Sequence, residues 1–357
     1  FPISGASAQS ATTAPPPAPP RASILVDIGS GLILEGRNIH TRLPPASTVK
    51  LMTALVAIEK LSPEALIGVS ALTAGRPAMR VGMKEGEQWR LADALRSMLM
   101  VSANDAAYAL AEAAAGSLEQ YATQAQAAAA RYGMRDSLLT DPAGLDDSTS
   151  FKGGSRMSAY DLAIAARNVL SVRELAEIAA TREYRFVGPD GAEHTLTNHN
   201  KLLTTHPYTG ALGLKTGRTS RAGSTFVAAA RRDGRTLVAV VLGAGDIYGA
   251  ATALLDKGFS MPRDARGTGE RIPAPKVVSF QTAAARAAAA AARQREAARI
   301  ERTAASDAGG FGAWLGAFGK VALVALVVAV VLRRRAVVRR RRRRRARARA
   351  MWEARRR

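Results

Sequence analysis

The most informative stretch of the chain is ALGLKTGRTSRAGSTFVAAARRDGRTLVAVVLG, residues 211–243. It divides into three apolar segments of strand length, ALGLKTG, GSTFVAAARR and RTLVAVVLG, separated by turn-forming residues. Asp233-Gly234 joins the last two segments and is a dipeptide typical of two-residue hairpin turns. The stretch therefore predicts neighbouring antiparallel strands.

Two more strands are expected near the N-terminus. The segments ASILVDI (22–28) and GLILEG (31–36) are apolar and β-branched, and Gly29-Ser30 separates them. This spacing predicts a second hairpin with a two-residue turn.

Helices are expected between these two sets of strands. Residues 47–60, STVKLMTALVAIEK, repeat apolar residues at helical spacing, with Ser47 at the N-terminal position. Residues 91–130 are rich in Ala and Leu and are predicted to be mostly helical. Strands, then helices, then strands indicate an α/β fold of the α+β type, with an antiparallel sheet flanked by helices and a helical subdomain, over residues 21–261.

The segments on either side of this domain have biased compositions. Residues 1–20 begin with FPISGASA, whose Ala6-Ser7-Ala8 pattern is typical of a signal-peptidase site, and continue into a proline-rich linker. Residues 262–310 are rich in Ala and Arg and contain few large apolar side chains, so they are predicted to form a solvated stalk.

A membrane anchor is expected next. Residues 311–332, FGAWLGAFGKVALVALVVAVVL, would extend about 33 Å as a helix, which is enough to span a bilayer once. The Arg-rich residues 333–357 follow directly, and positively charged flanks stay in the cytoplasm. The pattern predicts a single-pass protein of the cell membrane with an extracytoplasmic catalytic domain and a cytoplasmic C-terminus.

The net charge of +22 is mainly a property of this tail, which holds fifteen arginines and one glutamate and so carries +14 of it. Because the tail follows an apolar segment, we interpret it as a topology signal attracted to anionic lipids, and expect no nucleic-acid partner. The chain has no cysteine, and its four histidines lack metal-binding spacing. We therefore expect neither a metal nor another cofactor.

Three short motifs could carry chemistry: Ser47-Thr48-Val49-Lys50, Ser102-Ala103-Asn104 and Lys215-Thr216-Gly217. Ser47 and Lys50 lie one helical turn apart, close enough for the amine to take the hydroxyl proton. A lysine acts as a base at neutral pH only if burial and a nearby cation lower its pKa, and Lys215 could be that cation. The charge of Lys215 could also hold a substrate carboxylate while the peptide pairs with the strand edge.

The remaining roles follow from position. The backbone N–H groups of Ser47 and Arg218 are candidates for the oxyanion hole, and Ser102 could relay a proton to the leaving amine. Asn104 could hold the substrate amide and orient Lys50. Thr216 and Gly217 would bind substrate at the strand edge, which Gly217 leaves unobstructed.

Five blocks of the chain resemble those characteristic of D-alanyl-D-alanine carboxypeptidases, the low-molecular-mass penicillin-binding proteins. They are PPASTVKLMTALVA, LMVSANDAAYALAE, TDPAGLDD, LTNHNKLL and GLKTGRTSRAGSTFVAAARRDGRTLVAVVLG, within about residues 21–260. The resemblance implies a β-lactamase-like fold, an acyl-enzyme on Ser47, and removal of the terminal D-alanine from peptidoglycan stem peptides. It also implies that β-lactam antibiotics are covalent inhibitors, that Lys50 accepts the proton, that Ser102 belongs to the active site, and that Lys215 binds the substrate carboxylate.

The chain also departs from this family in two respects. Many members carry a separate β-rich domain and an amphipathic anchor, for which residues 262–310 are too short. His199 stands where an arginine or another polar residue is common, and relatives vary at the position of Arg218. We interpret His199 as a strand-end histidine with satisfied contacts, and its effect on substrate preference stays open.

Three other functions are considered. A serine β-lactamase would need a glutamate-activated water, and no ExxLN-like segment occurs between Asn104 and Lys215. A catalytically silent wall-binding scaffold could use the same fold. Transpeptidation would use the same residues, with an amine in place of water.

Overall fold

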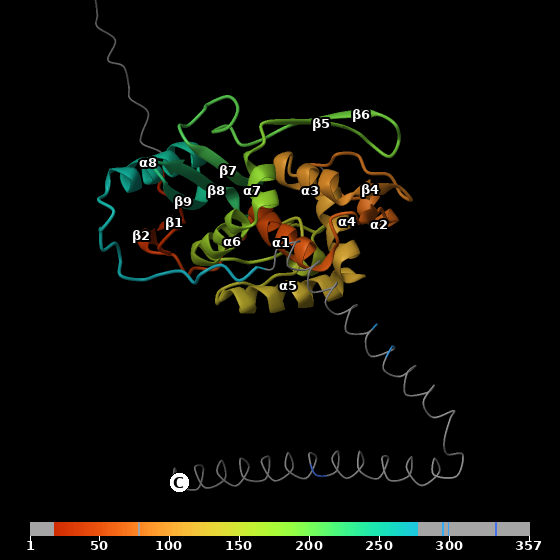
Figure 1. Ribbon diagram of the computed structural model, residues 1–357, viewed down its shortest axis with the longest axis horizontal. Helices are drawn as coiled ribbons and strands as arrows, with labels where there is room; N and C mark the ends of the chain where they lie inside the picture. The colour runs from red at the N-terminus through yellow and green to blue at the C-terminus, as the bar shows by residue number, and fades with distance from the viewer. Residues whose placement is uncertain (1–17, 78, 278–294, 296–298, 300–332, 334–357) are drawn as a thin grey trace, which may run out of the picture. The chain divides into compact units, whose positions relative to one another are not determined.

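The computed structural model describes residues 18–77 and 79–277, and the isolated residues 295, 299 and 333. The centre of the described part is a five-stranded antiparallel sheet with the strand order β2-β1-β9-β8-β7 (Figure 1). Its strands are β1 (Ala22–Asp27), β2 (Ile33–Arg37), β7 (Ala211–Thr219), β8 (Gly223–Arg232) and β9 (Arg235–Ala244). An α/β fold with an antiparallel sheet and flanking helices is thereby confirmed.

Of the two predicted hairpin turns, one is confirmed and the other is wrong. β8 and β9 are joined at Asp233-Gly234, and both residues have positive φ angles, 48° and 73°, as a type I′ turn requires. The two-residue turn predicted at Gly29-Ser30 is wrong, because β1 ends at Asp27 and β2 begins only at Ile33. The Asp27 carboxylate accepts hydrogen bonds from the backbone and hydroxyl of Ser30, at 3.1 and 3.2 Å, and so stabilises a wider turn.

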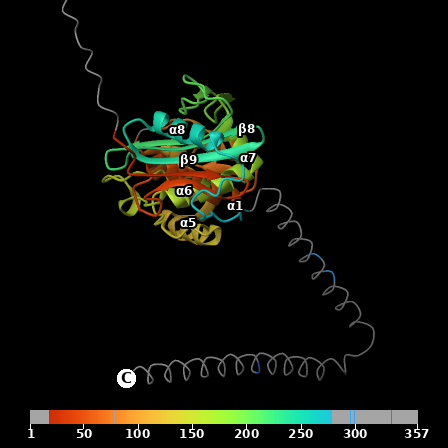
Figure 2. The same ribbon diagram turned by 90° about the vertical axis from the view of Figure 1, so that its left-hand side faces the viewer.

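Alternation along the strands gives the sheet two apolar faces. The outer face, which includes Phe226, Leu237 and Val241, packs against Ala251 and Leu255 of helix α8 (Ile247–Ser260). Figure 2 shows α8 on one side of β9 and α6 on the other.

The inner face packs against α6 (Ala159–Ser171), α7 (Arg173–Ala180) and a 3₁₀ turn, η1 (Ala46–Val49), which leads into a buried central helix, α1 (Lys50–Lys60). All α1 residues from Lys50 to Ile58 are buried, including the polar Lys50 and Thr53. The other helices are α2 (Ala71–Ala74), α3 (Leu91–Met100), α4 (Asn104–Ala115) and α5 (Leu118–Tyr132), with a 3₁₀ turn η2 (Phe151–Gly153). Two small two-stranded sheets, β3 (Leu66–Gly68) with β4 (Gln88–Arg90) and β5 (Glu183–Val187) with β6 (Glu193–Thr197), complete the described elements.

The predicted end of the folded domain at Met261 is too early. Residues 262–277, here called the C-terminal strap, continue along β2: Thr268 N–H donates to Ile33 O, and Ile33 N–H donates to Glu270 O, both at 2.9 Å. Ile272 is only 2% exposed and belongs to the main core. A single core side chain gives no periodic signal, so the sequence alone does not predict the strap.

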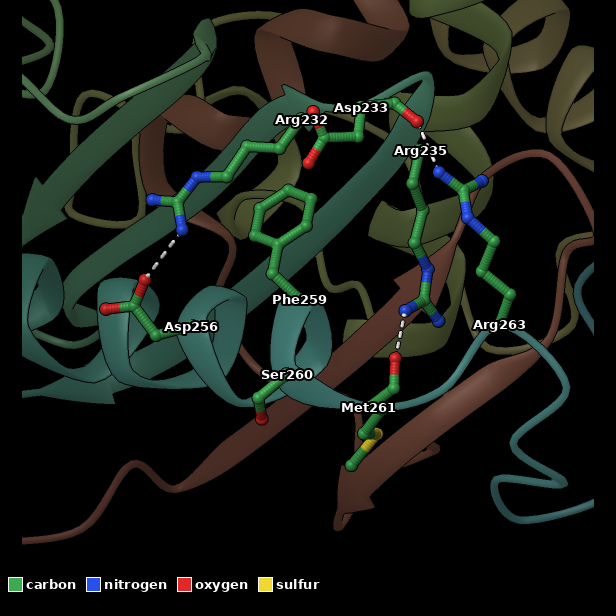
Figure 3. Close-up of a pocket in the computed structure, with 8 residues that line it drawn as sticks. All are labelled: Arg232, Asp233, Arg235, Asp256, Phe259, Ser260, Met261 and Arg263. Atoms are coloured by element: carbon green, nitrogen blue, oxygen red, sulfur yellow. Dashed lines mark hydrogen bonds and ion pairs between the residues drawn. The ribbon is translucent and has the colours of Figure 1, made fainter.

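A pocket of about 530 Å³ lies between the β8–β9 turn and the C-terminal end of α8 (Figure 3). Arg235 donates to the carbonyls of Gly258 and Met261, both at 2.8 Å, and pairs with Asp27. These contacts satisfy the helix-end carbonyls, so Arg235 has a structural role here.

Within residues 18–77 and 79–277, no helix is both long enough and apolar enough to cross a bilayer. The transmembrane segment predicted at residues 311–332 lies outside the described residues. So do residues 1–17, residues 278–294 of the predicted stalk, and the Arg-rich tail after Arg333.

Candidate active site

Ser47 and Lys50 meet where η1 passes into α1. Lys50 Nζ lies 2.8 Å from Ser47 Oγ, as their spacing predicts. Ser47 Oγ also donates a longer bond of 3.4 Å to Ala143 O, and does not cap the helix. The local chain thus places the hydroxyl and the amine in direct contact.

Lys50 is fully buried and makes two further hydrogen bonds, to Asn104 Oδ1 at 2.8 Å and to Ala143 O at 2.7 Å. Burial lowers its pKa well below the usual value, and the charge of Lys215 adds to this effect, while Asp141 and Asp105 oppose it. A neutral amine has two N–H donors and one lone pair. The two carbonyls can accept both N–H groups, which leaves the lone pair for the Ser47 hydroxyl once its hydrogen turns from Ala143 O toward Nζ.

Asn104, the first residue of α4, is held by two hydrogen bonds to carbonyl oxygens besides its bond with Lys50. Its backbone N–H donates to Met79 O at 2.7 Å, and its Nδ2 donates to Pro77 O at 3.1 Å. Because Nδ2 is held by a carbonyl, Oδ1 is the atom turned toward Lys50. The predicted orienting contact between Asn104 and Lys50 is therefore present.

Ser102 lies in the turn between α3 and α4, with a positive φ of 64° and little exposure. Its hydroxyl has no hydrogen-bond partner within the described part of the chain, so the predicted proton relay is not formed in this state. The relay stays a prediction.

The third motif lies on β7, which is an edge strand of the sheet. Lys215 pairs with Val227 and Gly217 with Thr225, which turns both toward the inner face, where η1 packs against β7. Lys215 is 1% exposed, donates to Thr216 O at 2.9 Å, and has its pKa lowered by burial to about 7.

Gly217 lies directly against the nucleophile. A Cβ atom at this position would be 2.7 Å from Ser47 N and 2.6 Å from Thr225 Oγ1. Glycine is therefore required for contact with the serine backbone, a more specific reason than the unobstructed edge predicted from sequence. The contact also brings the two predicted oxyanion-hole donors close together, because the exposed Arg218 follows Gly217.

The family model for D-alanyl-D-alanine carboxypeptidase matches residues 9–246. The chain belongs to this family. It is 34% identical over 253 residues to D-alanyl-D-alanine carboxypeptidase DacB2 of Mycobacterium tuberculosis, covering 69% of this chain and 84% of that protein. It is 28% identical over 248 residues to DacF of Bacillus subtilis, covering 67% of this chain but 62% of DacF. A crystal structure of D-alanyl-D-alanine carboxypeptidase from M. tuberculosis has a TM-score of 0.64 and 33% identity, covering 72% of this chain and 98% of that one.

One component of this D-alanyl-D-alanine carboxypeptidase site was not assigned from sequence. Asp141 is fully buried, and its Oδ1 accepts backbone N–H bonds from Ala143, Gly144 and Leu145. Its Oδ2 accepts from Tyr108 Oη at 2.5 Å and from Phe151 N at 2.9 Å. Asp141 thus fixes the loop whose Ala143 carbonyl binds Lys50. An aspartate before Pro and Gly is a turn signal, and could have indicated this role.

His199 follows β6 and is bound through its backbone: its N–H donates to Met100 O at 2.9 Å, and its carbonyl accepts from Tyr248 Oη at 3.2 Å. Burial, with the charge of Lys215 as a second cause, lowers the pKa of the imidazole. Its backbone contacts agree with a strand-end histidine, and the influence of Lys215 places it near the substrate-binding end of the site.

The contact at Gly217 gives a first prediction. Replacing Gly217 by Ala is expected to push β7 away from Ser47 and to lower the second-order rate of penicillin acylation by about 100-fold. Gly245→Ala is the matched control, because a Cβ there meets no atom within 4 Å. Equal acylation rates for the two variants would contradict the proposed close contact.

The two buried lysines of this carboxypeptidase give a pH prediction. Ser47 is activated only when Lys50 is neutral, so kcat/KM should fall as pH decreases through the pKa of Lys50. A substrate carboxylate is held only when Lys215 is charged, so kcat/KM should also fall as pH rises above about 7, where Lys215 loses its proton. D-alanine release across pH tests this, and a profile flat from about pH 5 to 9 would rule it out. Lys215→Arg should remove the fall at high pH, because a guanidinium stays charged.

Proposed function

We propose that the protein removes the terminal D-alanine from peptidoglycan stem pentapeptides through an acyl-enzyme on Ser47. The observation that carries the proposal is the buried Lys50 amine, 2.8 Å from Ser47 Oγ and with two carbonyl acceptors. This arrangement suits a neutral amine that takes a proton from the hydroxyl.

The steps follow from these contacts. Lys50 takes the proton as Ser47 Oγ bonds to the carbonyl carbon of the penultimate D-alanine, and the oxyanion lies near the N–H groups of Ser47 and Arg218. The peptide C–N bond then breaks, and the proton passes to the leaving amine of the last D-alanine, with Ser102 as the proposed relay. Water next attacks the ester and gives a proton to Lys50, and Ser47 regains its hydroxyl hydrogen.

The contacts of the nearby carboxylates do not favour a β-lactamase. Asp141 and Asp105 are the two carboxylates that influence Lys50. Asp141 is occupied by five donors, and Asp105 accepts from the backbone N–H groups of Val81, Gly82 and Met83. Neither bonds to Ser47, so neither is arranged to activate a water for rapid deacylation.

Penicillin distinguishes the candidate functions. Intact-mass spectrometry of the penicillin-treated protein should show one long-lived adduct, mapped to the peptide that contains Ser47, and a stem pentapeptide should release D-alanine. Rapid multiple turnover of penicillin would favour the β-lactamase. A Ser47→Ala variant that matches the parent protein in labelling and cleavage would favour the silent scaffold.

Attachment to the membrane is the second part of the proposal. We infer from sequence that residues 311–332 span the membrane once and that the Arg-rich tail holds the C-terminus in the cytoplasm. Replacing the tail arginines by neutral residues should change insertion or membrane attachment, measured by fractionation and protease protection. Unchanged topology and attachment would refute the role of the tail.

A further inference from the structure

The two oxygens that accept hydrogen bonds from Lys50 are carried by two different parts of the chain. Asn104 Oδ1 belongs to the first residue of α4, and Ala143 O belongs to the loop that follows Asp141. The Lys50 amine is therefore held in one place only if these two parts keep a fixed position relative to each other.

The first oxygen is held by residues 76–77 and 79–83, here called the cover loop, which follow α2. Pro77 O and Met79 O both accept hydrogen bonds from Asn104. The N–H groups of residues 81–83 donate to the carboxylate of the next residue, the fully buried Asp105, at 3.2, 2.9 and 3.1 Å. The orientation of the Asn104 amide thus depends on the position of the cover loop.

The second oxygen is held by residues 141–151, here called the Asp141 loop. Both ends of this loop bind the Asp141 carboxylate, through Ala143 N and Phe151 N. Tyr108 Oη donates to the same carboxylate. Because Tyr108 lies four residues after Asn104 on α4, one face of this helix supports both oxygens that bind Lys50.

Arg76 connects the two loops. It directly precedes Pro77 in the cover loop, and its Nη1 donates to Thr149 O in the Asp141 loop at 3.3 Å. Its Nε donates to Leu72 O at 3.0 Å, and its Cζ lies over the Tyr108 ring, 4.6 Å from the centroid. A guanidinium can make these three contacts at once, because it is planar, donates in fixed directions and stacks on aromatic rings.

We propose that Arg76 is a positioning residue for the serine–lysine pair: it ties the cover loop to the Asp141 loop and so keeps Asn104 Oδ1 and Ala143 O in place around the Lys50 amine. Its two hydrogen bonds go to the backbone carbonyls of Leu72 and Thr149, so it acts on the reaction only through these loops. The inference rests on the proposed function, because it concerns the base of that reaction. It adds a residue that affects the rate of acylation without affecting the binding of substrate.

Arg76→Met tests this link, since methionine keeps an unbranched side chain but has no donor and no charge. Intact-mass spectrometry over a range of penicillin concentrations separates the limiting rate constant of acylation from the half-saturating concentration. The limiting rate constant should fall about 10-fold, because the base is misplaced, while the half-saturating concentration should change by less than about 2-fold. A loss of folded protein alone would lower the amount of adduct and not the rate constant. Arg80→Met, which changes an exposed arginine of the same loop, is the matched control and should alter neither quantity.

A double-mutant cycle shows whether Arg76 acts through Asn104. In an Asn104→Ala background, only Ala143 O is left for Arg76 to position, so Arg76→Met should lower the limiting rate constant by about 3-fold instead of about 10-fold. The proposal would be overturned by a rate constant that Arg76→Met leaves unchanged in the parent protein, or that it lowers to the same extent in both backgrounds.

Arg76→Lys takes the place of Arg76→Met if the melting curve shows that the methionine variant does not fold. Lysine keeps a positive charge near Tyr108 but lacks the planar fork, so the limiting rate constant should still fall by about 3-fold or more. A rate constant equal to that of the parent protein would count against the link. Failure of the proposed function gives a different result, because the parent protein itself would then form no adduct on Ser47.

Discussion

Replacing Lys50 by methionine is expected to slow acylation of Ser47 by penicillin and by peptide about 10⁴-fold. Methionine has a similar length but no proton acceptor, so the Ser47 hydroxyl loses the only amine within hydrogen-bond distance in the described residues. The rate constant for adduct formation, followed by intact-mass spectrometry, measures this effect.

The same substitution should change the stability of the protein much less than it changes the rate of acylation. A buried lysine with a lowered pKa costs free energy of folding at neutral pH, because the unfolded chain binds a proton that the folded chain excludes. This cost grows as pH falls from the pKa of an ordinary lysine toward that of Lys50. Methionine removes this cost, but Asn104 Oδ1 and Ala143 O lose the hydrogen bonds that Lys50 donates. Each oxygen that stays unpaired lowers the free energy of unfolding by about 1–3 kcal/mol. We expect a melting temperature close to that of the parent protein.

Lys60→Met is the matched control, since Lys60 ends the same helix and is exposed. It should leave both acylation and melting unchanged. If Lys50→Met retained more than about a tenth of the parent rate, another group would have to be the base, and the proposed mechanism would fail.

The site shows which of its parts can be predicted from sequence. Ser47 and Lys50 are three residues apart on a helix, so periodicity alone brings them together. Lys215 and Gly217 are two residues apart on one strand, so strand alternation, which is also a local pattern, places them on the same face. Bringing these two pairs together is a matter of tertiary structure, and only the resemblance to a family predicted it.

The remaining parts depend on contacts that no local pattern encodes. Ala143 contributes a carbonyl oxygen, which every residue has, so its side chain gave no indication of a role. The C-terminal strap and the wider turn after Asp27 are likewise held by backbone hydrogen bonds and single side chains. A composition rich in Ala and Arg predicted a stalk without a core over residues 262–310, but residues 262–277 pack along β2 and Ile272 joins the core of the domain.

Replacing Asp141 by alanine is expected to have the largest effect on stability. Its carboxylate accepts five hydrogen bonds in a fully buried position, and alanine would leave those donors unpaired. We expect the free energy of unfolding to fall by at least about 4 kcal/mol, measured by denaturant titration. Acylation should fall as well, because the loop would no longer hold Ala143 O against Lys50.

Asp141→Asn separates the positioning role of the residue from its charge. Asparagine keeps the shape and one acceptor oxygen, so the loop should survive with a smaller loss of stability, of about 1–3 kcal/mol. The negative charge of Asp141 raises the pKa of Lys50. Its removal should therefore move the rising limb of the kcat/KM profile to lower pH, a shift that a purely structural residue would not produce.

Asp147→Asn, an exposed change in the same loop, is the control and should leave the profile in place. If the profiles of Asp141→Asn and Asp147→Asn coincided, Asp141 would support only the shape of the loop, and the charge balance around Lys50 would have to be set by the other lysine and Asp105 alone.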